Sequence, residues 1–224
     1  MMGMPWAAIS LPDGSVLMGA IALVLISFCL GALPFGLWIG RLGARIDIRQ
    51  HGSGNLGATN VLRLLGPRLG ITTLVLDVGK GWLAVALAPA WAGLGCVADG
   101  SPWPLLGGVA AVAGHILTPL AGFRGGKGVA TSLGIFLALA PAAALLGVLG
   151  FVVCVWICRY VSVGSMTLAV IFPIATAFLG PPAPLRTYVV ALGILLAGVL
   201  AWRHRINWAR IAAGKETRFQ WRSK

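Results

Sequence analysis

The sequence has 224 residues, of which 58% are hydrophobic and only 10% are charged, whereas soluble domains have roughly 45–50% apolar and about 25% charged residues. So few charges cannot cover the surface of a water-soluble fold, which excludes a soluble enzyme or a soluble binding module. The net charge of +12 suits anionic lipid headgroups and anionic substrates, but the sequence has no soluble basic module of the kind that nucleic-acid binding would need.

Long uncharged stretches divide the chain into membrane segments. Four of them cover residues 14–40, 81–98, 128–158 and 160–185, and each is near or above the roughly 18 apolar residues that indicate a transmembrane helix. We therefore expect an all-α, polytopic membrane protein with a single domain over residues 1–224. Its segments should lie at about 16–40, 70–94, 104–121, 129–140, 141–158, 162–180 and 186–203, since Pro141 interrupts the third stretch.

The first apolar segment is expected to be a retained helix rather than a signal peptide. Residues 1–10 contain no Lys or Arg that could form a basic n-region. The first arginines follow the apolar run instead of preceding it, which favours an N-terminus outside the cell.

The basic residues indicate which side each loop faces. All but two of the 17 Lys and Arg residues fall in loops near 41–69, 122–128, 159–165 and 203–224, the exceptions being Lys80 and Arg186. The positive-inside rule places these loops in the cytoplasm, so we expect about seven crossings and a cytoplasmic C-terminus. This count requires a short hairpin over residues 128–158. One long tilted helix remains the alternative.

The segment from Gly52 to Arg63 is small and polar in an otherwise apolar chain. Its glycines would let successive backbone N–H groups turn toward one anion, and Arg63 supplies a forked positive charge. An ordinary turn is the alternative, because Gly, Ser and Asn also dominate turns, but the density of donors favours an anion-binding loop. The glycines are Gly52, Gly54 and Gly57, and the side-chain donors are Ser53, Asn55, Thr59 and Asn60.

A second glycine-rich segment, residues 123–132, surrounds Lys127 and then opens an apolar helix. A phosphate could bind at the N-terminus of this helix, with Lys127 as a point charge. The spacing differs from that of a Walker A motif, which excludes a nucleotide-hydrolysing P-loop. A cytoplasmic turn with ordinary positive-inside charge remains the alternative.

Polar residues near the end of the chain form a third group. His204 and Asn207 are three residues apart, so a continuing helix would place them on one side. Ser162 and Ser165 have the same spacing, although intramembrane hydroxyls commonly bond to the helix backbone. A structural role is the alternative for each of these residues.

Two charges lie inside the second membrane segment. Asp77 and Lys80 are three residues apart, and charges at such a depth are expensive unless they are paired. We therefore predict a mutual ion pair that lets this helix insert.

The motifs together resemble one bacterial enzyme family. They are Gly-Ser-Gly-Asn-x-Gly-Ala-Thr-Asn-x-x-Arg at 52–63, Gly-His followed by Gly-Gly-Lys-Gly-Val-Ala-Thr within 114–131, and His-Arg-x-Asn with Gly-x-Glu within 204–216. Over essentially its whole length the chain is similar to the PlsY-type acyl phosphate:glycerol-3-phosphate acyltransferases. The resemblance implies acyl transfer to glycerol 3-phosphate at the cytoplasmic face of the bacterial inner membrane, as the first step of phospholipid synthesis.

The resemblance also implies a role for each motif residue. Binding of acyl phosphate would use Ser53, Gly54, Asn55, Gly57, Thr59, Gly126 and Lys127. Binding of glycerol 3-phosphate would use Arg63, Lys127, Ser165, His204 and Asn207. Catalysis would depend on Ser53, Lys127 and His204, whereas Glu216 would be structural. Asp77 and Lys80 are also expected to be structural, on the ion-pair argument above.

The expected mechanism is direct attack by the 1-hydroxyl of the substrate. An acyl phosphate is already activated, so alignment and fixed donors can supply most of the catalysis. The sequence has no Gly-x-Ser-x-Gly elbow, which argues against an acyl-enzyme. The base stays open between His204 and a phosphate oxygen of a substrate.

We expect no cofactor and no metal, because the sequence has no carboxylate cluster to hold Mg²⁺. The expected partners are the two substrates and membrane lipids, with no nucleic acid, and the oligomeric state is not indicated. A membrane transporter of phosphorylated anions is the alternative function. A non-catalytic lipid-binding protein is less favoured, because basic residues alone would suffice for it.

Overall fold

The computed structural model describes residues 14–93 and 103–220, and in these ranges the chain forms helices and no strands. The elements, in chain order, are α1 (Gly14–Gly31), α2 (Phe35–Ala44), η1 (Ile48–Gln50), α3 (Ala58–Leu65), α4 (Pro67–Gly93), α5 (Trp103–Leu117), η2 (Pro119–Ala121), α6 (Val129–Leu139), α7 (Pro141–Cys158), α8 (Val161–Leu179), α9 (Leu185–Arg203) and α10 (Arg205–Ala212).

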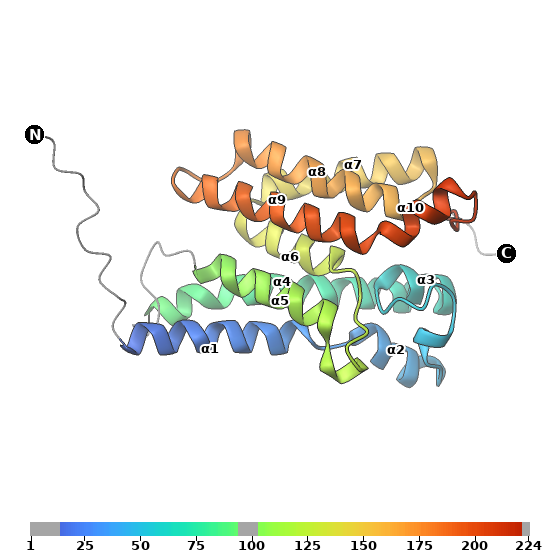
Figure 1. Cartoon of the computed structure of the whole chain (residues 1–224), viewed down its shortest axis with the longest axis horizontal. Coiled ribbons are helices and arrows are strands. Elements are labelled where there is room, and N and C mark those ends of the chain that lie inside the picture. The colour runs from blue at the N-terminus through green and yellow to red at the C-terminus, as the bar shows by residue number, and fades with distance from the viewer. Residues whose placement is uncertain (1–13, 94–102, 221–224) are drawn as a thin grey trace, which may run out of the picture.

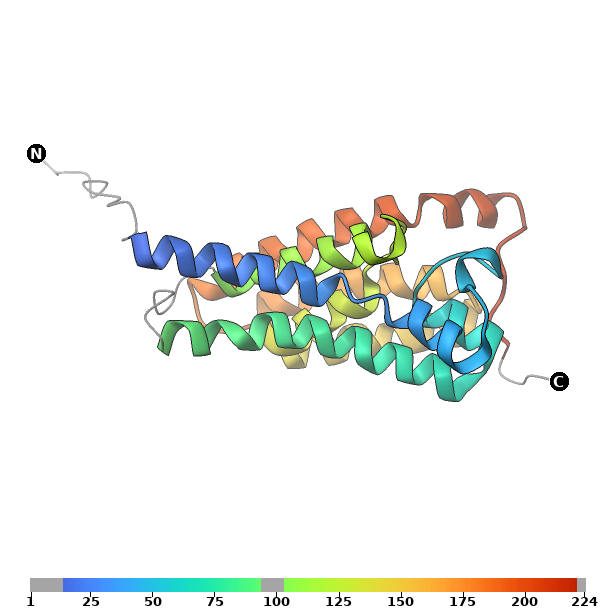
Figure 2. The ribbon, with the colours of Figure 1, turned by 90° about the horizontal axis from the view of Figure 1, so that it is seen from below.

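The long helices lie side by side in an elongated bundle (Figure 1). Six stretches of the described chain are long and apolar enough to cross a membrane, and α6 is a shorter apolar helix. The expected all-helical membrane fold with about seven segments is confirmed. The first described residues of α1 and the helix α10 lie at opposite ends of the bundle (Figures 1 and 2).

The first membrane segment, expected as one helix over 16–40, is broken. Helix α1 ends at Gly31 and α2 begins at Phe35. Pro34 lies in the break, where it has no N–H to continue the helix and disfavours helical backbone in the residue before it. The chain therefore changes direction before it reaches the first glycine-rich loop.

Residues 128–158 form the hairpin rather than one long helix. Ala140, directly before Pro141, leaves the helical conformation with φ −151° and ψ 73°, and α7 turns back antiparallel to α6 (Figure 1). Lys127 and Arg159 both contact the C-terminal part of the chain, through Asn207 and Phe219 respectively. The two basic residues are therefore at the same end of the bundle.

Helix α6 is too short to cross a bilayer alone. Its 11 residues span about 16 Å, roughly half of a hydrocarbon core of about 30 Å. Figure 1 shows α6 beginning partway along the bundle, so the loop before it, residues 122–128, reaches inward between the neighbouring helices.

Small residues let these helices approach one another closely. A Cβ atom on Gly31 of α1 would lie 2.0 Å from the Ala111 carbonyl oxygen of α5, and one on Gly134 of α6 would lie 1.9 Å from the Val78 carbonyl oxygen of α4. Such close approaches are typical of helix packing in membranes, where small residues bring backbones together.

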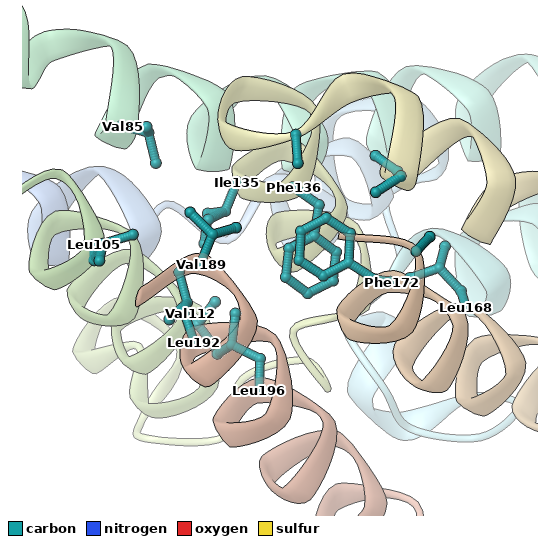
Figure 3. Packing of buried hydrophobic residues seen from close by; sticks show 14 residues of the cluster. Val85, Leu105, Val112, Ile135, Phe136, Leu168, Phe172, Val189, Leu192 and Leu196 are labelled. Atoms are coloured by element: carbon teal, nitrogen blue, oxygen red, sulfur yellow. The ribbon is translucent and has the colours of Figure 1, made fainter. Parts of the chain in front are cut away.

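A buried apolar cluster joins α6, α8 and α9 (Figure 3). At its centre the rings of Phe136 and Phe172 stack, with their centroids 3.6 Å apart. Leu168, Val189 and Leu192 surround them. This cluster connects the C-terminal hairpin to the α6 side of the bundle.

The predicted ion pair lies in the bundle interior. Lys80 Nζ is 2.8 Å from Asp77 Oδ1, and both side chains are almost fully buried. Lys80 also donates to the Leu33 carbonyl oxygen at 2.9 Å, and Thr118 Oγ1 donates to the Ala32 carbonyl oxygen. These two side chains satisfy carbonyl groups that the break after α1 leaves without helical partners.

We predict a strongly non-additive effect when this pair is removed. Asp77→Leu should cost about 3–5 kcal/mol of stability, because it leaves a buried ammonium without its counter-ion. The double variant Asp77→Leu with Lys80→Met should cost less than the sum of the two single changes. Unfolding in detergent measures this directly, and simple additivity would show that the two charges do not stabilise each other.

Candidate active site

The first glycine-rich loop is folded around the side chain of Asn60, which is only 1% exposed. Its amide nitrogen donates to the carbonyl oxygens of Ile48 at 3.1 Å and His51 at 3.2 Å. Its amide oxygen accepts from the Ser53 backbone N–H at 3.0 Å. Gly52 has φ +60°, and a Cβ there would lie 2.4 Å from Asn60 Oδ1, so the loop requires glycine at this position.

This geometry corrects the expectation that Asn60 offers a donor to an anion, because its amide is used within the loop. The backbone N–H of Gly54 donates to His51, and that of Gly57 donates to Asn55 Oδ1 at 2.8 Å. Within the described chain, the hydroxyls of Ser53 and Thr59 make no hydrogen bond. These two hydroxyls, together with Asn55 Nδ2, are the side-chain donors that the loop leaves for an anion within the described chain.

The second glycine-rich loop is held from two sides. The backbone N–H groups of Gly125 and Gly126 donate to the Ile116 and His115 carbonyl oxygens, at 3.1 and 3.2 Å. Their own carbonyl oxygens accept from Arg203 Nη2, at 3.4 and 2.9 Å. The Gly126 N–H is therefore already used, so it is not a free donor for the expected contact with acyl phosphate.

Close packing explains why both positions are glycine. A Cβ on Gly125 would lie 2.0 Å from the His115 carbonyl oxygen, and a Cβ on Gly126 would lie 2.1 Å from His115 Nε2. The backbone before Lys127 thus rests directly on the end of α5.

A chain of hydrogen bonds runs from Lys127 to the C-terminal segment. Lys127 Nζ donates to Asn207 Oδ1 at 2.5 Å. Asn207 Nδ2 donates to Glu216 Oε1 at 2.6 Å, and the Ser162 hydroxyl donates to the same oxygen at 3.2 Å. We call these four residues, from the loop before α6, α10, the C-terminal segment and α8, the Lys127 cluster.

Arg63 reaches the same segment from α3. Its Nη2 donates to the Thr217 carbonyl oxygen at 3.2 Å. Burial lowers the pKa of Arg63, and the nearby Glu216 carboxylate partly opposes this shift. A planar, forked charge therefore lies beside the cluster.

His204 is only 2% exposed, and its Nδ1 lies 2.8 Å from the Leu200 carbonyl oxygen. Because a carbonyl only accepts, we assign the hydrogen of the neutral ring to Nδ1, which leaves a lone pair on Nε2. Burial, followed by the charge of Lys127, lowers the pKa of His204 to about 4. The ring is therefore neutral at pH 7 and can accept a hydrogen bond or a proton.

Lys127 remains mostly charged at neutral pH despite its surroundings. Burial lowers its pKa to about 8, the Glu216 carboxylate raises it, and Arg63, Arg210 and Arg203 lower it further. A cation in this position, whose hydrogen bond goes to the neutral Asn207 side chain, suits an incoming phosphate.

The two glycine-rich loops meet at one small cavity. Leu56 of the first loop and Gly126 of the second both line it, with Asp77, His115 and Thr118 among the other lining residues. Leu56 and Gly126 are 70 positions apart in the sequence. They come together at the break after α1, whose residues also line the cavity.

The structure does not bring Ser165 into the Lys127 cluster. Its hydroxyl donates to the Val161 carbonyl oxygen of its own helix at 2.8 Å, whereas Ser162 reaches Glu216. The sequence reasoning missed Ser162 as the hydroxyl that joins the cluster, and it treated Glu216 as structural only. Both residues are revealed by the path of the C-terminal segment, which hydrophobicity and spacing do not predict.

Arg203 was also missed. In sequence it is one of several arginines after the last apolar segment, where positive-inside charge explains it without any further role. The only local signal was its position directly before His204.

Comparisons with known proteins identify the family. A family model described as glycerol-3-phosphate acyltransferase matches residues 21–214. A glycerol-3-phosphate acyltransferase of Solidesulfovibrio magneticus is 43% identical over 199 residues, covering 89% of this chain and 94% of the relative. One from Enterococcus faecalis is 43% identical over 206 residues, covering 90% and 92%.

Solved structures agree with the sequence comparisons. Two crystal structures of PlsY, an integral membrane glycerol 3-phosphate acyltransferase, are 35% identical to this chain. The glycerol 3-phosphate form has a TM-score of 0.80 and covers 90% of this chain and 96% of PlsY. The lysophosphatidic acid form has a TM-score of 0.79, with 90% and 95% covered.

The charges of the cluster predict how the pKa of Lys127 responds to substitution. Glu216→Gln removes the group that raises this pKa, so the value should fall below about 8. Lysine acetylation followed by mass spectrometry across a pH series measures it. Asp47→Asn is the control, since Asp47 pairs with Arg41 and Arg49 instead. An unchanged or raised value in Glu216→Gln would contradict the assigned charge arrangement.

Proposed function

The chain belongs to the glycerol-3-phosphate acyltransferase family, and we propose that it transfers a fatty acyl group from acyl phosphate to the 1-hydroxyl of sn-glycerol 3-phosphate. It is an integral membrane acyltransferase of lipid synthesis. The products of the proposed reaction are lysophosphatidic acid and inorganic phosphate, and the reaction is the first step of phospholipid synthesis.

The observation that supports this proposal most strongly is the convergence of cationic and polar side chains on one carboxylate. Asn207 and Ser162 donate to Glu216, and the charges of Lys127 and Arg63 are close enough to interact with it. A phosphate monoester offers the same kind of acceptor with more charge and more oxygens. We assign glycerol 3-phosphate to this place.

The residues proposed for glycerol 3-phosphate are Arg63, Lys127, Ser165, His204 and Asn207. Ser165 contributes in this scheme if its hydroxyl turns from the helix backbone toward the substrate. The acyl phosphate is assigned to the first loop, where the Ser53 and Thr59 hydroxyls have no other partner in the described chain. Because the two loops meet where Leu56 and Gly126 lie close together, this assignment puts the two substrates on neighbouring loops.

The proposed reaction proceeds by direct attack. The substrate 1-hydroxyl oxygen bonds to the acyl carbon, the bond from that carbon to the phosphate oxygen breaks, and phosphate leaves with the electron pair. The hydroxyl proton goes to His204 Nε2 or to a phosphate oxygen. Lys127 and the loop donors stabilise the charge that develops on the acyl and phosphate oxygens.

A transporter of phosphorylated anions would place its binding groups near the bilayer midplane between inverted repeats. Here the Lys127 cluster joins the C-terminal segment to α8 and α10 toward one end of the bundle (Figure 1). This position suits an enzyme that receives one substrate from the membrane and the other from water.

The decisive assay combines the purified protein in detergent with glycerol 3-phosphate and one acyl donor at a time. With acyl phosphate, lysophosphatidic acid and phosphate should form in equal amounts, and acyl-CoA should not replace the donor. Formation of lysophosphatidic acid from acyl-CoA alone would contradict the proposed donor. A lack of product with every donor would contradict the proposed reaction.

Gly57 tests the first loop without disturbing its fold. Its φ of −75° is ordinary, and a Cβ would only approach Asn55 Oδ1 to 3.2 Å, so Gly57→Ala should fold. Turnover should nevertheless fall strongly if phosphate approaches this part of the backbone as proposed, because the added methyl group would crowd it. Gly54→Ala is the matched comparison, since Gly54 has φ +70° and alanine there should strain the loop itself. Near-normal turnover by Gly57→Ala would show that the loop is only a turn.

His204→Ala distinguishes two roles for the imidazole. If His204 removes the proton, the rate at saturating substrate should fall by about 10²–10⁴. If the ring only holds the substrate, the apparent affinity for glycerol 3-phosphate should weaken and the maximal rate should stay close to normal. Wild-type kinetics over the full concentration range would exclude both roles.

We place the protein in the bacterial inner membrane with its active site facing the cytoplasm, because the cluster lies among the loops that carry most basic residues. Single cysteines in a cysteine-free background test this in intact cells. Pro182→Cys should react with a membrane-impermeant thiol reagent, and Arg124→Cys should react only after the membrane is opened. The two positions are both exposed. Labelling of Arg124→Cys from outside would reverse the proposed orientation.

A further inference from the structure

Arg203 makes contacts that none of the expected substrate residues makes. It is the last residue of α9, and one of its terminal nitrogens donates to the carbonyl oxygens of both Gly125 and Gly126. Its Nε is buried and has no hydrogen-bond partner in the described chain. The inner part of the side chain is therefore buried at the base of the Lys127 loop, and the residue is only partly exposed.

The hydrogen bonds from Arg203 complete those that hold the backbone of Gly125 and Gly126 in one conformation. The N–H groups of Gly125 and Gly126 are held by carbonyl oxygens at the end of α5, and their carbonyl groups are held by Arg203. Neither glycine has a side chain that could restrict its backbone, so these four hydrogen bonds determine the conformation. Lys127 follows directly, and its own side chain then reaches Asn207.

We propose that Arg203 is a positioning residue for Lys127: by binding the two glycine carbonyl groups, it holds the loop so that the ammonium group faces the glycerol 3-phosphate site. The inference deepens the proposed function and names a residue that acts through another residue on the same site.

Charge gives a second reason for this role. The oxygen ends of the two carbonyl dipoles carry partial negative charge, and they would repel a phosphate if they turned toward the site. The guanidinium group binds and neutralises them. Arginine suits this task better than lysine because its planar group presents several donors in a fixed arrangement.

The neighbouring Arg205 provides a matched control. It is exposed and donates to the Trp202 carbonyl oxygen at 3.0 Å, with its guanidinium carbon 4.4 Å from the centre of the Trp202 ring. Replacing it by alanine removes the same charge from nearly the same place, but it removes no contact to the Lys127 loop.

The experiment compares Arg203→Ala, Arg203→Lys and Arg205→Ala by two readouts. Arg203→Ala should raise the KM for glycerol 3-phosphate about tenfold to a hundredfold, the factor that loss of one charge-assisted hydrogen bond represents, and Arg203→Lys should recover part of this. Hydrogen exchange should accelerate at the amides of residues 125–127 in Arg203→Ala and stay slow elsewhere in the bundle. Arg205→Ala should match the wild type in both readouts.

Three results would overturn the inference. Equal kinetic effects of Arg203→Ala and Arg205→Ala would mean that only bulk charge matters. A raised KM without faster loop exchange would mean that Arg203 contacts the substrate itself. Unchanged exchange together with unchanged kinetics would mean that the loop does not depend on Arg203. If Arg203→Ala fails to fold, the same comparisons apply to Arg203→Lys.

The exchange readout also separates this inference from the proposed function. Should the wild-type protein fail to acylate glycerol 3-phosphate, the proposed function fails, but loop exchange in Arg203→Ala still decides whether Arg203 positions the loop.

Discussion

The arrangement of the site depends on one requirement, that polar groups inside an apolar bundle find partners within the protein. Lys80 meets it by binding both Asp77 and the Leu33 carbonyl oxygen. Because Pro34 stops the first helix, this carbonyl has no helical partner and accepts instead from Lys80 and from the Phe35 backbone N–H. The break would be costly without these partners, and it directs the chain toward α2 and the first glycine-rich loop. His115, whose Nδ1 lies 3.7 Å from Asp77 Oδ1, extends the same group of buried polar residues to the second loop.

The same requirement explains how the site is organised before any substrate arrives. The groups that shape the two loops already have partners: Asn60 holds the first loop, and Arg203 with the end of α5 holds the second. Lys127 pairs with Asn207, which pairs with Glu216. A substrate phosphate entering here must replace some of these contacts, so its binding free energy is the difference between two sets of charge-assisted hydrogen bonds. Electrostatic catalysis requires donors that are held in place before the reaction and move little during it.

Sequence reasoning predicted the parts of this protein that depend on local pattern. The apolar runs predicted the membrane helices because each run is a local property, and the spacing of Asp77 and Lys80 predicted their ion pair for the same reason. It failed where a tertiary partner decides. Asn60 was expected to face an anion, but the carbonyl groups of Ile48 and His51 use its amide. Ser162 and Ser165 are equally plausible site hydroxyls in the sequence, because they lie three residues apart in the same helix. Only the path of the C-terminal segment determines that Ser162 meets Glu216.

The central claim is that the Lys127 cluster receives the phosphate of glycerol 3-phosphate, and the structure of this protein with glycerol 3-phosphate bound tests it most directly. The account predicts a phosphate oxygen within hydrogen-bonding distance of Lys127 Nζ, with Arg63 on another oxygen and the contact between Lys127 and Asn207 replaced or shared. A phosphate bound away from Lys127, with the hydrogen bonds from Lys127 to Asn207 and from Asn207 to Glu216 unchanged, would contradict it.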